Sequence, residues 1–203
     1  MARTADSLAP VAPIVLEGAH ARLEPLTRAH VDALMRAGAD DAIWTWLPSR
    51  PRTRADFAQW VEDTLRAQAE GRELPFAIVD RRTGEVAGST RLLNISAHDR
   101  RVEIGATWLA PSAQRTAINT ECKYLLLRHC FETLGCARVE LKTDARNENS
   151  QRAIARIGAV REGVLRKHMR TQGGFQRDSV YFSIVDDEWP AVRARLEAML
   201  GRA

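Results

Sequence analysis

RVEIGATWLAPSAQRTAINTECKYLLLRHCFE, residues 101–132, is the stretch that decides the fold of this chain. Over residues 102–109 apolar side chains alternate with other side chains, which predicts a β-strand. A polar loop follows over 111–119. From 120 to about 133 the apolar residues recur at helical spacing, which predicts a helix with one broad apolar face. Strand, loop and helix therefore follow one another directly.

The joint between this strand and this helix has the properties of an anion site. The first turn of a helix has N–H groups without helical partners and carries the positive end of the helix dipole. The polar loop that leads into it contains Arg115. These features predict a cradle for a phosphate group. The alternative is an ordinary connection between a strand and a helix, which binds nothing.

Length and composition favour one globular enzyme domain. The chain has 203 residues, of which 45% are hydrophobic and 28% are charged. Its net charge of +4 suits a phosphorylated cofactor, or a weak attraction to RNA or ribosomes. Because no dense basic run is interleaved with aromatic residues, a solvated basic surface is favoured over a nucleic-acid site, and we expect no DNA binding.

Cysteine usage and hydropathy indicate a cytoplasmic protein that does not enter a membrane. Cys122, Cys130 and Cys136 form no CxxC pair, and we expect small buried thiols in a reducing compartment. The histidines show no ligand spacing, so no metal is expected. No apolar run reaches about 18 residues, and residues 1–13 lack a signal-peptide core. We expect those residues to form a flexible tail.

Periodicity and turn residues predict the remaining elements of a single domain over residues 14–203. The expected class is α/β, with a mixed sheet of α+β type in which the first strands form an antiparallel meander. Strands are expected over 14–26 (with a turn at 18–20), 76–79, 85–93, 138–144, 160–170 and 179–185, and helices over 30–39, 53–71, 149–156 and 188–200.

A loop after the first helix carries an unusual number of large apolar side chains. Trp44, Trp46 and Leu47 lie close together just before Pro48. Such a group can form the wall of a binding pocket. It can equally fill a hydrophobic space beneath the loop.

The order of elements, together with several motifs, resembles the GNAT-type N-acetyltransferases. Within them it is similar to the RimJ/RimL branch, which acetylates the N-termini of ribosomal proteins and has relatives that act on small amines. The resemblance covers residues 14–189. The motifs that carry it are Glu103-Ile104-Gly105 with Trp108-Leu109, the loop 114–120, the Asn147–Ser150 block with Ala153-Ile154 and 157–159, and the strands 161–166 and 177–183.

This resemblance implies a largely antiparallel GNAT sheet with two splayed strands, flanked by helices. It implies direct transfer of an acetyl group from acetyl-CoA to a primary amine in a ternary complex, without a metal. A protein N-terminus, a polyamine or an aminoglycoside-like drug would each suit as acceptor. Association with ribosomes and formation of a homodimer are further expectations that come from the branch.

One departure from the family concerns the phosphate loop. The family pattern (Q/R)-x-x-G-x-(G/A) is met by Gln114, but Ala117 and Asn119 occupy the glycine positions. Alanine is small, whereas Asn tolerates left-handed backbone and can cap the helix. Glu121, in the expected first turn, would oppose a bound anion. The departure motivates an alternative function, a non-catalytic module that senses CoA or binds a partner.

The resemblance assigns the cofactor-binding residues to three places. Backbone N–H groups of the loop would hold the pyrophosphate, helped by the Arg115 guanidinium, and the edge of the central strand would pair with the pantetheine arm. Asn147 and Ser150 would lie beside that arm. The set is Trp108, Leu109, Ala110, Gln114, Arg115, Thr116, Ala117, Ile118, Asn119, Thr120, Asn147 and Ser150.

Three residues are candidates for proton transfer. Ser150 would protonate the departing thiolate, unless it serves only the N-terminus of a helix. Glu103 or His168 would take the proton of the amine. Their alternatives are an ion pair of Glu103 with a neighbouring arginine and an exposed position for His168. Asp178, with Trp44, Trp46 and Leu47, is expected at the acceptor pocket.

Overall fold

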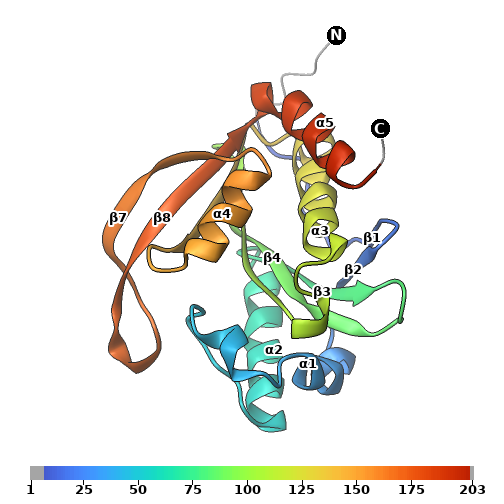
Figure 1. Ribbon diagram of the computed structural model, residues 1–203, viewed down its shortest axis with the longest axis vertical. Coiled ribbons are helices and arrows are strands. Elements are labelled where there is room, and N and C mark those ends of the chain that lie inside the picture. The colour runs from blue at the N-terminus through green and yellow to red at the C-terminus, as the bar shows by residue number, and fades with distance from the viewer. Residues whose placement is uncertain (1–6, 202–203) are drawn as a thin grey trace.

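The computed structural model describes residues 7–201, which form one eight-stranded sheet flanked by helices (Figure 1). The strand order is β1-β2-β3-β4-β5-β6-β8-β7, and every pair is antiparallel except β5–β6. The predicted α/β class with a mixed sheet is therefore confirmed. The strands are β1 Leu16–Glu17, β2 Ala21–Pro25, β3 Leu74–Asp80, β4 Val86–Ser96, β5 Arg101–Leu109, β6 Arg138–Asp144, β7 Val160–Arg170 and β8 Gln176–Val185.

Helices cover both faces of the sheet. One apolar cluster packs α3, α4 and α5 against one face, and a second packs α1, α2 and Trp44 against the other. The helices are α1 Val31–Ala37, α2 Arg54–Ala69, α3 Ala117–Arg128, α4 Glu148–Arg156 and α5 Trp189–Met199. Short helical turns lie at Arg28–His30, Asp41–Trp44, Pro111–Ala113, Gln172–Gly174 and Asp186–Glu188, and a π-helix continues α3 over His129–Leu134.

Strands β5 and β6 pair only at their beginnings. Their register runs Arg101↔Arg138, Val102↔Val139 and Glu103↔Glu140 and then stops. Beyond these pairs the two strands diverge, and we call this divergence the splay. The edge of β5 that faces β6 is therefore free of a strand partner beyond Glu103. The other end of the sheet is the β7–β8 hairpin, which curves away from the helices (Figure 1).

A β-bulge in β5 changes which residues face which helices. Ser89 pairs with Trp108, but Arg91 pairs with Gly105, so β5 has one extra residue, and Ala106 has a φ of 48°. Before the bulge Ile104 belongs to the cluster beneath α3. After it Trp108 belongs to the cluster beneath α1 and α2. Without the extra residue, the even-numbered positions would keep facing α3.

Helix α3 begins three residues earlier than expected. Thr116 rather than Asn119 is its N-cap, with its hydroxyl accepting a hydrogen bond from the N–H of Ile118 at 3.3 Å. The predicted start at Thr120 is therefore wrong, because the capping hydroxyl lies upstream and Ala117 and Asn119 are already helical. Gly135 ends the π-helix in left-handed conformation, as expected of a helix stop.

The remaining elements confirm the predicted pattern with small changes at their ends. Strands β6 and β7 have the predicted bounds, and β8 begins three residues before the expected 179. Thr53 caps α2 with a reciprocal capping box to Asp56. The cysteines are free and buried, and burial raises the pKa of the Cys122 thiol to about 12. None of the helices within residues 7–201 is long and apolar enough to cross a membrane.

The beginning of the chain differs from the expected tail. Residues 1–6 of the predicted tail over 1–13 lie outside the described residues. Leu8 is 8% exposed and belongs to the main core cluster. Its N–H donates to the carbonyl of Ala97 at 3.1 Å, and that of Ala9 donates to Leu134 at 2.9 Å. The prediction is wrong for these two residues, because Leu8 provides an apolar anchor.

Candidate active site

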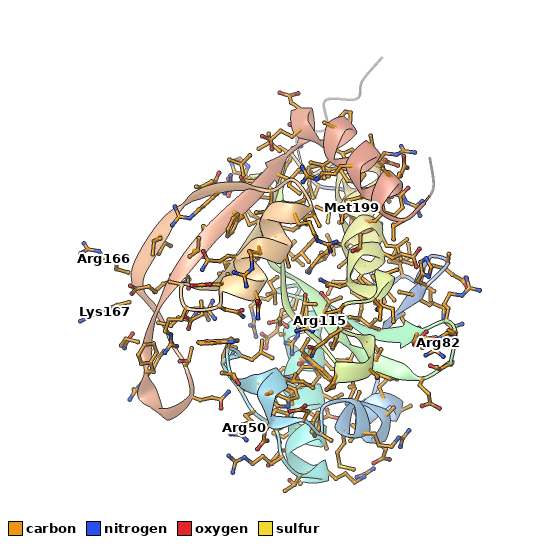
Figure 2. The ribbon with its side chains drawn as sticks, viewed as in Figure 1. Arg50, Arg82, Arg115, Arg166, Lys167 and Met199 are labelled. Carbon is orange, nitrogen blue, oxygen red and sulfur yellow. The ribbon has the colours of Figure 1, made fainter. Side chains whose placement is uncertain are left out.

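The loop between β5 and α3 is held by side chains that bond to its own backbone. The Gln114 amide donates to the carbonyl of Leu109 at 2.9 Å, and the Thr116 hydroxyl donates to Ala113 at 2.7 Å. Arg115 is exposed and has a φ of 59°, the left-handed region usually left to glycine. Within the described part of the chain, its guanidinium makes no ion pair. Figure 2 shows Arg115 at this loop.

Glu121 does not oppose an anion at this loop, contrary to expectation. It is fully buried, and its carboxylate accepts hydrogen bonds from the backbone N–H groups of Ala19 at 2.9 Å, His20 and Ala21 at 2.6 Å. These donors belong to the β1–β2 turn. A Cβ atom on Gly18 would lie 2.2 Å from the Glu121 carboxyl carbon. The Glu121 carboxylate therefore holds this turn in place and does not face the loop before α3.

Lys123 is a buried cation on α3 that the sequence analysis does not single out. It is 8% exposed, and its ammonium donates to the Thr107 hydroxyl at 2.9 Å, just after the bulge in β5. The Thr107 hydroxyl is also 2.7 Å from that of Thr90. Burial lowers the pKa of Lys123 to about 8. The signal was a single lysine inside the apolar run of α3.

The N-terminus of α4 separates the roles expected of Asn147 and Ser150. Asn147 is the N-cap, and its side-chain oxygen accepts a hydrogen bond from the Ser150 N–H at 3.0 Å. The capping role that was the alternative for Ser150 thus belongs to Asn147. Ser150 is half-buried, and within residues 7–201 its hydroxyl has no hydrogen-bond partner. It is available to a substrate.

Glu103 forms a buried ion pair beside the splay. It is 1% exposed, and its Oε2 atom accepts hydrogen bonds from Lys142 Nζ at 2.7 Å and Asn94 Nδ2 at 2.8 Å. The partner is a lysine on the neighbouring strand rather than the arginine considered from the sequence. A Cβ atom on Gly105 would lie 2.8 Å from Oε1 of Glu103. Because Gly105 has no side chain, it leaves room for the Oε1 atom of Glu103.

His168 lies on the same face of the sheet and is half-buried, so the exposed position considered for it is wrong. Its Nδ1 atom is 3.1 Å from the Ser179 hydroxyl, and its Nε2 atom is 3.4 Å from the Tyr181 hydroxyl. Burial, with the charges of Lys142 and Arg177, lowers the pKa of His168. The neutral imidazole is therefore favoured, the form that accepts a proton.

Strand alternation places a set of polar side chains together around these two residues. On β6 and β8 every second residue faces away from α3 and α4. We call this set the polar face. Its members are Glu103, Lys142, Asp144, His168, Arg177, Ser179 and Tyr181.

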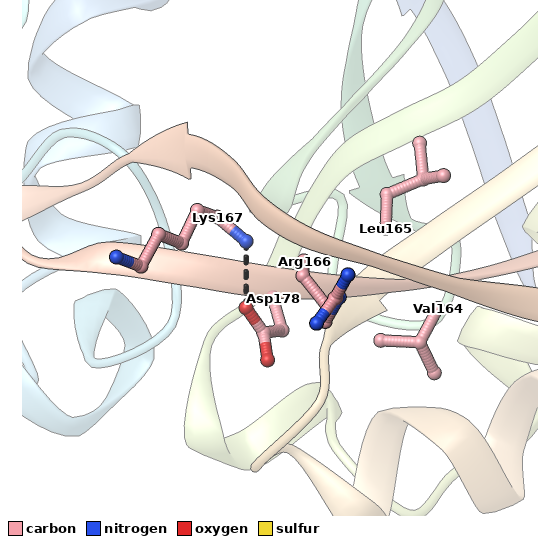
Figure 3. A pocket seen from close by; sticks show the side chains of 5 residues that line it. All are labelled: Val164, Leu165, Arg166, Lys167 and Asp178. Atoms are coloured by element: carbon pink, nitrogen blue, oxygen red, sulfur yellow. Dashed lines mark hydrogen bonds between the residues drawn. The ribbon is translucent and has the colours of Figure 1, made fainter.

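Asp178 does not belong to the polar face. It lies between Arg177 and Ser179 on β8, so its side chain is directed to the opposite face. Its carboxylate accepts a hydrogen bond from the backbone N–H of Lys167 at 2.7 Å. There it lines a groove of about 560 Å³ on the β7–β8 hairpin (Figure 3), with Val164, Leu165, Arg166 and Lys167. Asp178 is thus apart from Glu103 and His168.

The loop that carries Trp44, Trp46 and Leu47, here called the tryptophan loop, divides its large side chains between the hydrophobic core and a partly exposed wall. Trp44 is 1% exposed and packs on Trp108, with ring centroids 5.0 Å apart, so it fills a hydrophobic space. Trp46 and Leu47 are half-buried. The Arg146 guanidinium lies 5.1 Å from the centre of the Trp46 ring and 3.9 Å from that of Phe175.

The tip of the β7–β8 hairpin is fastened to this loop. The Gln172 amide donates to the carbonyl of Trp44 at 2.9 Å and to that of Leu47 at 2.8 Å. Arg177 Nη1 donates to the carbonyl of Trp46 at 3.3 Å. The loop therefore closes one end of the polar face. Over residues 7–201 no three His, Cys, Asp or Glu side chains gather where they could hold a metal ion.

Comparison with known proteins agrees with this geometry. Residues 20–160 match the family described as acetyltransferase (GNAT) domain. The chain belongs to the GNAT acetyltransferase family. It is an acyltransferase, and the GNAT fold implies acetyl-CoA as co-substrate and an amine as acceptor.

Known GNAT proteins match the chain over most of its length. A GCN5-related N-acetyltransferase from Brucella melitensis has a TM-score of 0.91 and 32% identity, over 98% of this chain and 90% of that chain. YoaA of Bacillus subtilis (strain 168), an uncharacterized N-acetyltransferase, is 26% identical over 84% of this chain and 96% of its own. RimJ of Mycobacterium smegmatis, in complex with CoA-disulfide, shares the fold, with a TM-score of 0.78 and 24% identity over 97% and 95%.

Proposed function

We propose that this GNAT chain moves an acetyl group from acetyl-CoA directly to a primary amine within a ternary complex. The observation that carries the proposal is the splay, which opens the edge of β5 next to the N-terminus of α3. A thioester that lies along this edge has the polar face on its other side. Both substrates can therefore be present at once, and no acetyl-enzyme is needed.

The loop before α3 suits a pyrophosphate despite its lack of glycine. Arg115 adopts the left-handed conformation, and Thr116 caps the helix, so the N–H groups of Ala117 and Asn119 in its first turn have no helical partner, whereas that of Ile118 bonds to the Thr116 hydroxyl. This geometry supports the catalytic proposal over the non-catalytic alternative that the missing glycines at 117 and 119 motivate. We infer that the cofactor-binding set predicted from the resemblance holds the pyrophosphate here and the pantetheine arm along Trp108, Leu109 and Ala110.

Acetyl transfer requires three proton or charge movements, each of which has a candidate group. A backbone N–H near Leu109 would stabilise the negative oxygen as the amine attacks the thioester carbon. Glu103 or neutral His168 would remove the proton of the ammonium before attack. As the new C–N bond forms and the C–S bond breaks, the second amine proton would go to the thiolate through the Ser150 hydroxyl. The products are an N-acetyl amine and free CoA thiol.

The finer assignments rest on the resemblance. We propose the RimJ/RimL type of acceptor, either a protein N-terminus or a small amine, in the cytoplasm. An α-amine has a pKa near 8 and needs less help to lose its proton than a lysine does. Ribosome association, supported by the net charge of +4, and a homodimer remain predictions.

The test is release of free thiol from acetyl-CoA with a panel of small amines and peptides. Mass spectrometry of the acceptor should show one added acetyl group for each thiol released. Thiol release that does not depend on any acceptor would contradict the proposal. Acceptor-dependent release with a protein N-terminus but not with small amines would favour the RimJ/RimL assignment.

A further inference from the structure

Arg177 is a buried cation that no carboxylate of residues 7–201 contacts. The residue is 5% exposed. Its Nε atom donates to the Ser179 hydroxyl at 3.0 Å, and its Nη1 atom donates to the carbonyl of Trp46 at 3.3 Å. Both acceptors are neutral. Arg91, another buried arginine, instead contacts a carboxylate, that of Glu73, at 2.7 Å.

The carboxylates closest to Arg177 are engaged by other cations. Asp144 accepts hydrogen bonds from the Arg146 guanidinium at 2.9 and 2.8 Å. Glu103 is paired with Lys142. Both acids stabilise the charge of Arg177 from a distance, but burial outweighs them and lowers its pKa. Taking a charge out of water without a contacting counterion is costly, so the site favours an anion.

The position of Arg177 connects it to the expected acceptor. Ser179 bonds both to Arg177 Nε and to His168 Nδ1, so the guanidinium lies one side chain from a candidate base. The carbonyl of Trp46 fixes its other edge. Its Nη2 atom has no acceptor within the described residues and is not among the fully buried unpaired atoms. A ligand on the polar face can therefore reach it.

The charge of the surroundings also selects among amines. Lys142, Arg146 and Arg177 share this end of the polar face with the carboxylates of Glu103 and Asp144, and the next carboxylate along β6, that of Glu140, is engaged by Arg138. His168 is neutral where its pKa is lowered. One positive charge thus remains uncompensated. A polyamine would bring further positive charge to this region, whereas a carboxylate would neutralise it.

We propose that the acceptor is a primary amine that also carries a carboxylate, and that Arg177 binds this carboxylate. The inference rests on the proposed function and specifies its substrate class. Arginine suits the task because its planar donors match the two oxygens of a carboxylate. A free amino acid and a peptide with an acidic residue near its N-terminus both offer this chemistry. Arg177 is thereby a specificity-determining residue.

The test compares matched acceptors that differ in one charge. Thiol release from acetyl-CoA is measured with amino acids and their carboxamides, with peptides that begin in acidic or amide residues, and with a polyamine. We expect the acid of each pair to have at least a tenfold higher kcat/KM, mainly through KM. The pair that shows the larger ratio identifies the amino acid or the peptide as the source of the carboxylate.

Variants assign the preference to Arg177. Arg177→Gln should lower kcat/KM for the acid much more than for the carboxamide and so abolish the acid preference, and Arg177→Lys should keep part of the preference. Arg166→Gln, on the outside of the hairpin (Figure 2), is the charge-matched control and should keep all of it. If Arg177→Gln fails to fold, two measurements still test the proposal: the ratio of kcat/KM for acid and carboxamide in the wild type, and the change of this ratio in Arg177→Lys.

Three results would overturn the inference. Wild-type protein that acetylates carboxamides or polyamines as well as acids would refute the carboxylate while the proposed function stands. An acid preference that survives in Arg177→Gln would remove Arg177 from it. Failure of every amine would refute the proposed function itself, and the inference with it.

Discussion

The ammonium of Lys142 lies 2.7 Å from Oε2 of Glu103, just beyond the last residue pair that joins β5 to β6. Both side chains are nearly buried, with 13% and 2% of their surface exposed. The ion pair therefore joins the two strands at the root of the splay. It also places a carboxylate next to the position proposed for the amine.

Removal of one partner of this pair should destabilise the protein strongly. In Lys142→Met the Glu103 carboxylate stays buried with Asn94 as its remaining donor, and we expect a loss of about 3–5 kcal/mol in the free energy of unfolding. The double variant Glu103→Gln/Lys142→Met should recover part of it, because no buried charge is left unpaired. Urea denaturation of the wild type and the two variants measures these differences. An unchanged midpoint for Lys142→Met would show that the pair does not hold the strands together.

Ser150→Ala should slow acetyl transfer at least tenfold, which corresponds to about 1.4 kcal/mol of barrier. The hydroxyl has no partner in the described chain, whereas the helix cap is provided by Asn147, so the helix should remain intact. Steady-state thiol release gives the rate, and the KM for acetyl-CoA should change little. Asn149→Ala, one residue earlier and exposed, is the control. Unchanged turnover would remove Ser150 from the mechanism.

Arg115 should affect cofactor binding and stability in different directions. Arg115→Ala keeps the left-handed backbone and loses the guanidinium, so acetyl-CoA should bind more weakly in calorimetry. Arg115→Gly should weaken binding equally, but it should raise the free energy of unfolding by about 1 kcal/mol because glycine adopts a φ of 59° without strain. Equal affinity of wild type and Arg115→Ala would show that this loop does not hold the pyrophosphate through Arg115.

Lys123 should make the stability of the protein rise with pH in the alkaline range. Its pKa is about 8 in the fold, below the ordinary 10.5, so the unfolded chain binds more protons between these values. The cost of burying the charged ammonium lowers the free energy of unfolding by about 3 kcal/mol below pH 8, and this cost disappears toward pH 10.5. Lys123→Met should therefore be more stable than wild type at pH 7, with the difference shrinking by pH 10.

Denaturant unfolding at pH 7 and pH 10 measures this convergence. Lys167→Met, a substitution at an exposed lysine, is the control and should leave the pH dependence of wild type unchanged. Parallel curves for wild type and Lys123→Met would contradict the expected cost of burying this ammonium.

Much of the fold could be predicted from the sequence because its strongest patterns are local. The alternation in β5, the helical spacing in α3 and the glycine at 135 each depend on neighbours along the chain. The start of α3 was misplaced because Arg115, rather than a glycine, takes the left-handed turn and exposes Thr116 as the cap. Side-chain type gave no hint of this exception.

The candidate site was less accessible from the sequence because it depends on register. The sequence predicts Asp178 at the acceptor pocket, but strand alternation directs Asp178 to one face of the sheet and Ser179 to the other. Arg177 and Lys142 become important only once β6 and β8 are paired. Trp44 and Trp46, two residues apart, divide between the core and the site.

The attachment of the hairpin tip to the tryptophan loop has a consequence for how acceptor choice can evolve. Gln172 binds main-chain carbonyl groups, which every amino acid possesses. Substitutions at positions 46 and 47 can therefore reshape the wall without detaching it. Under the proposed function, selection or a designed library can vary these two side chains while Gln172 preserves the spacing, so new amine preferences would be reachable by single codon changes rather than by loop insertions.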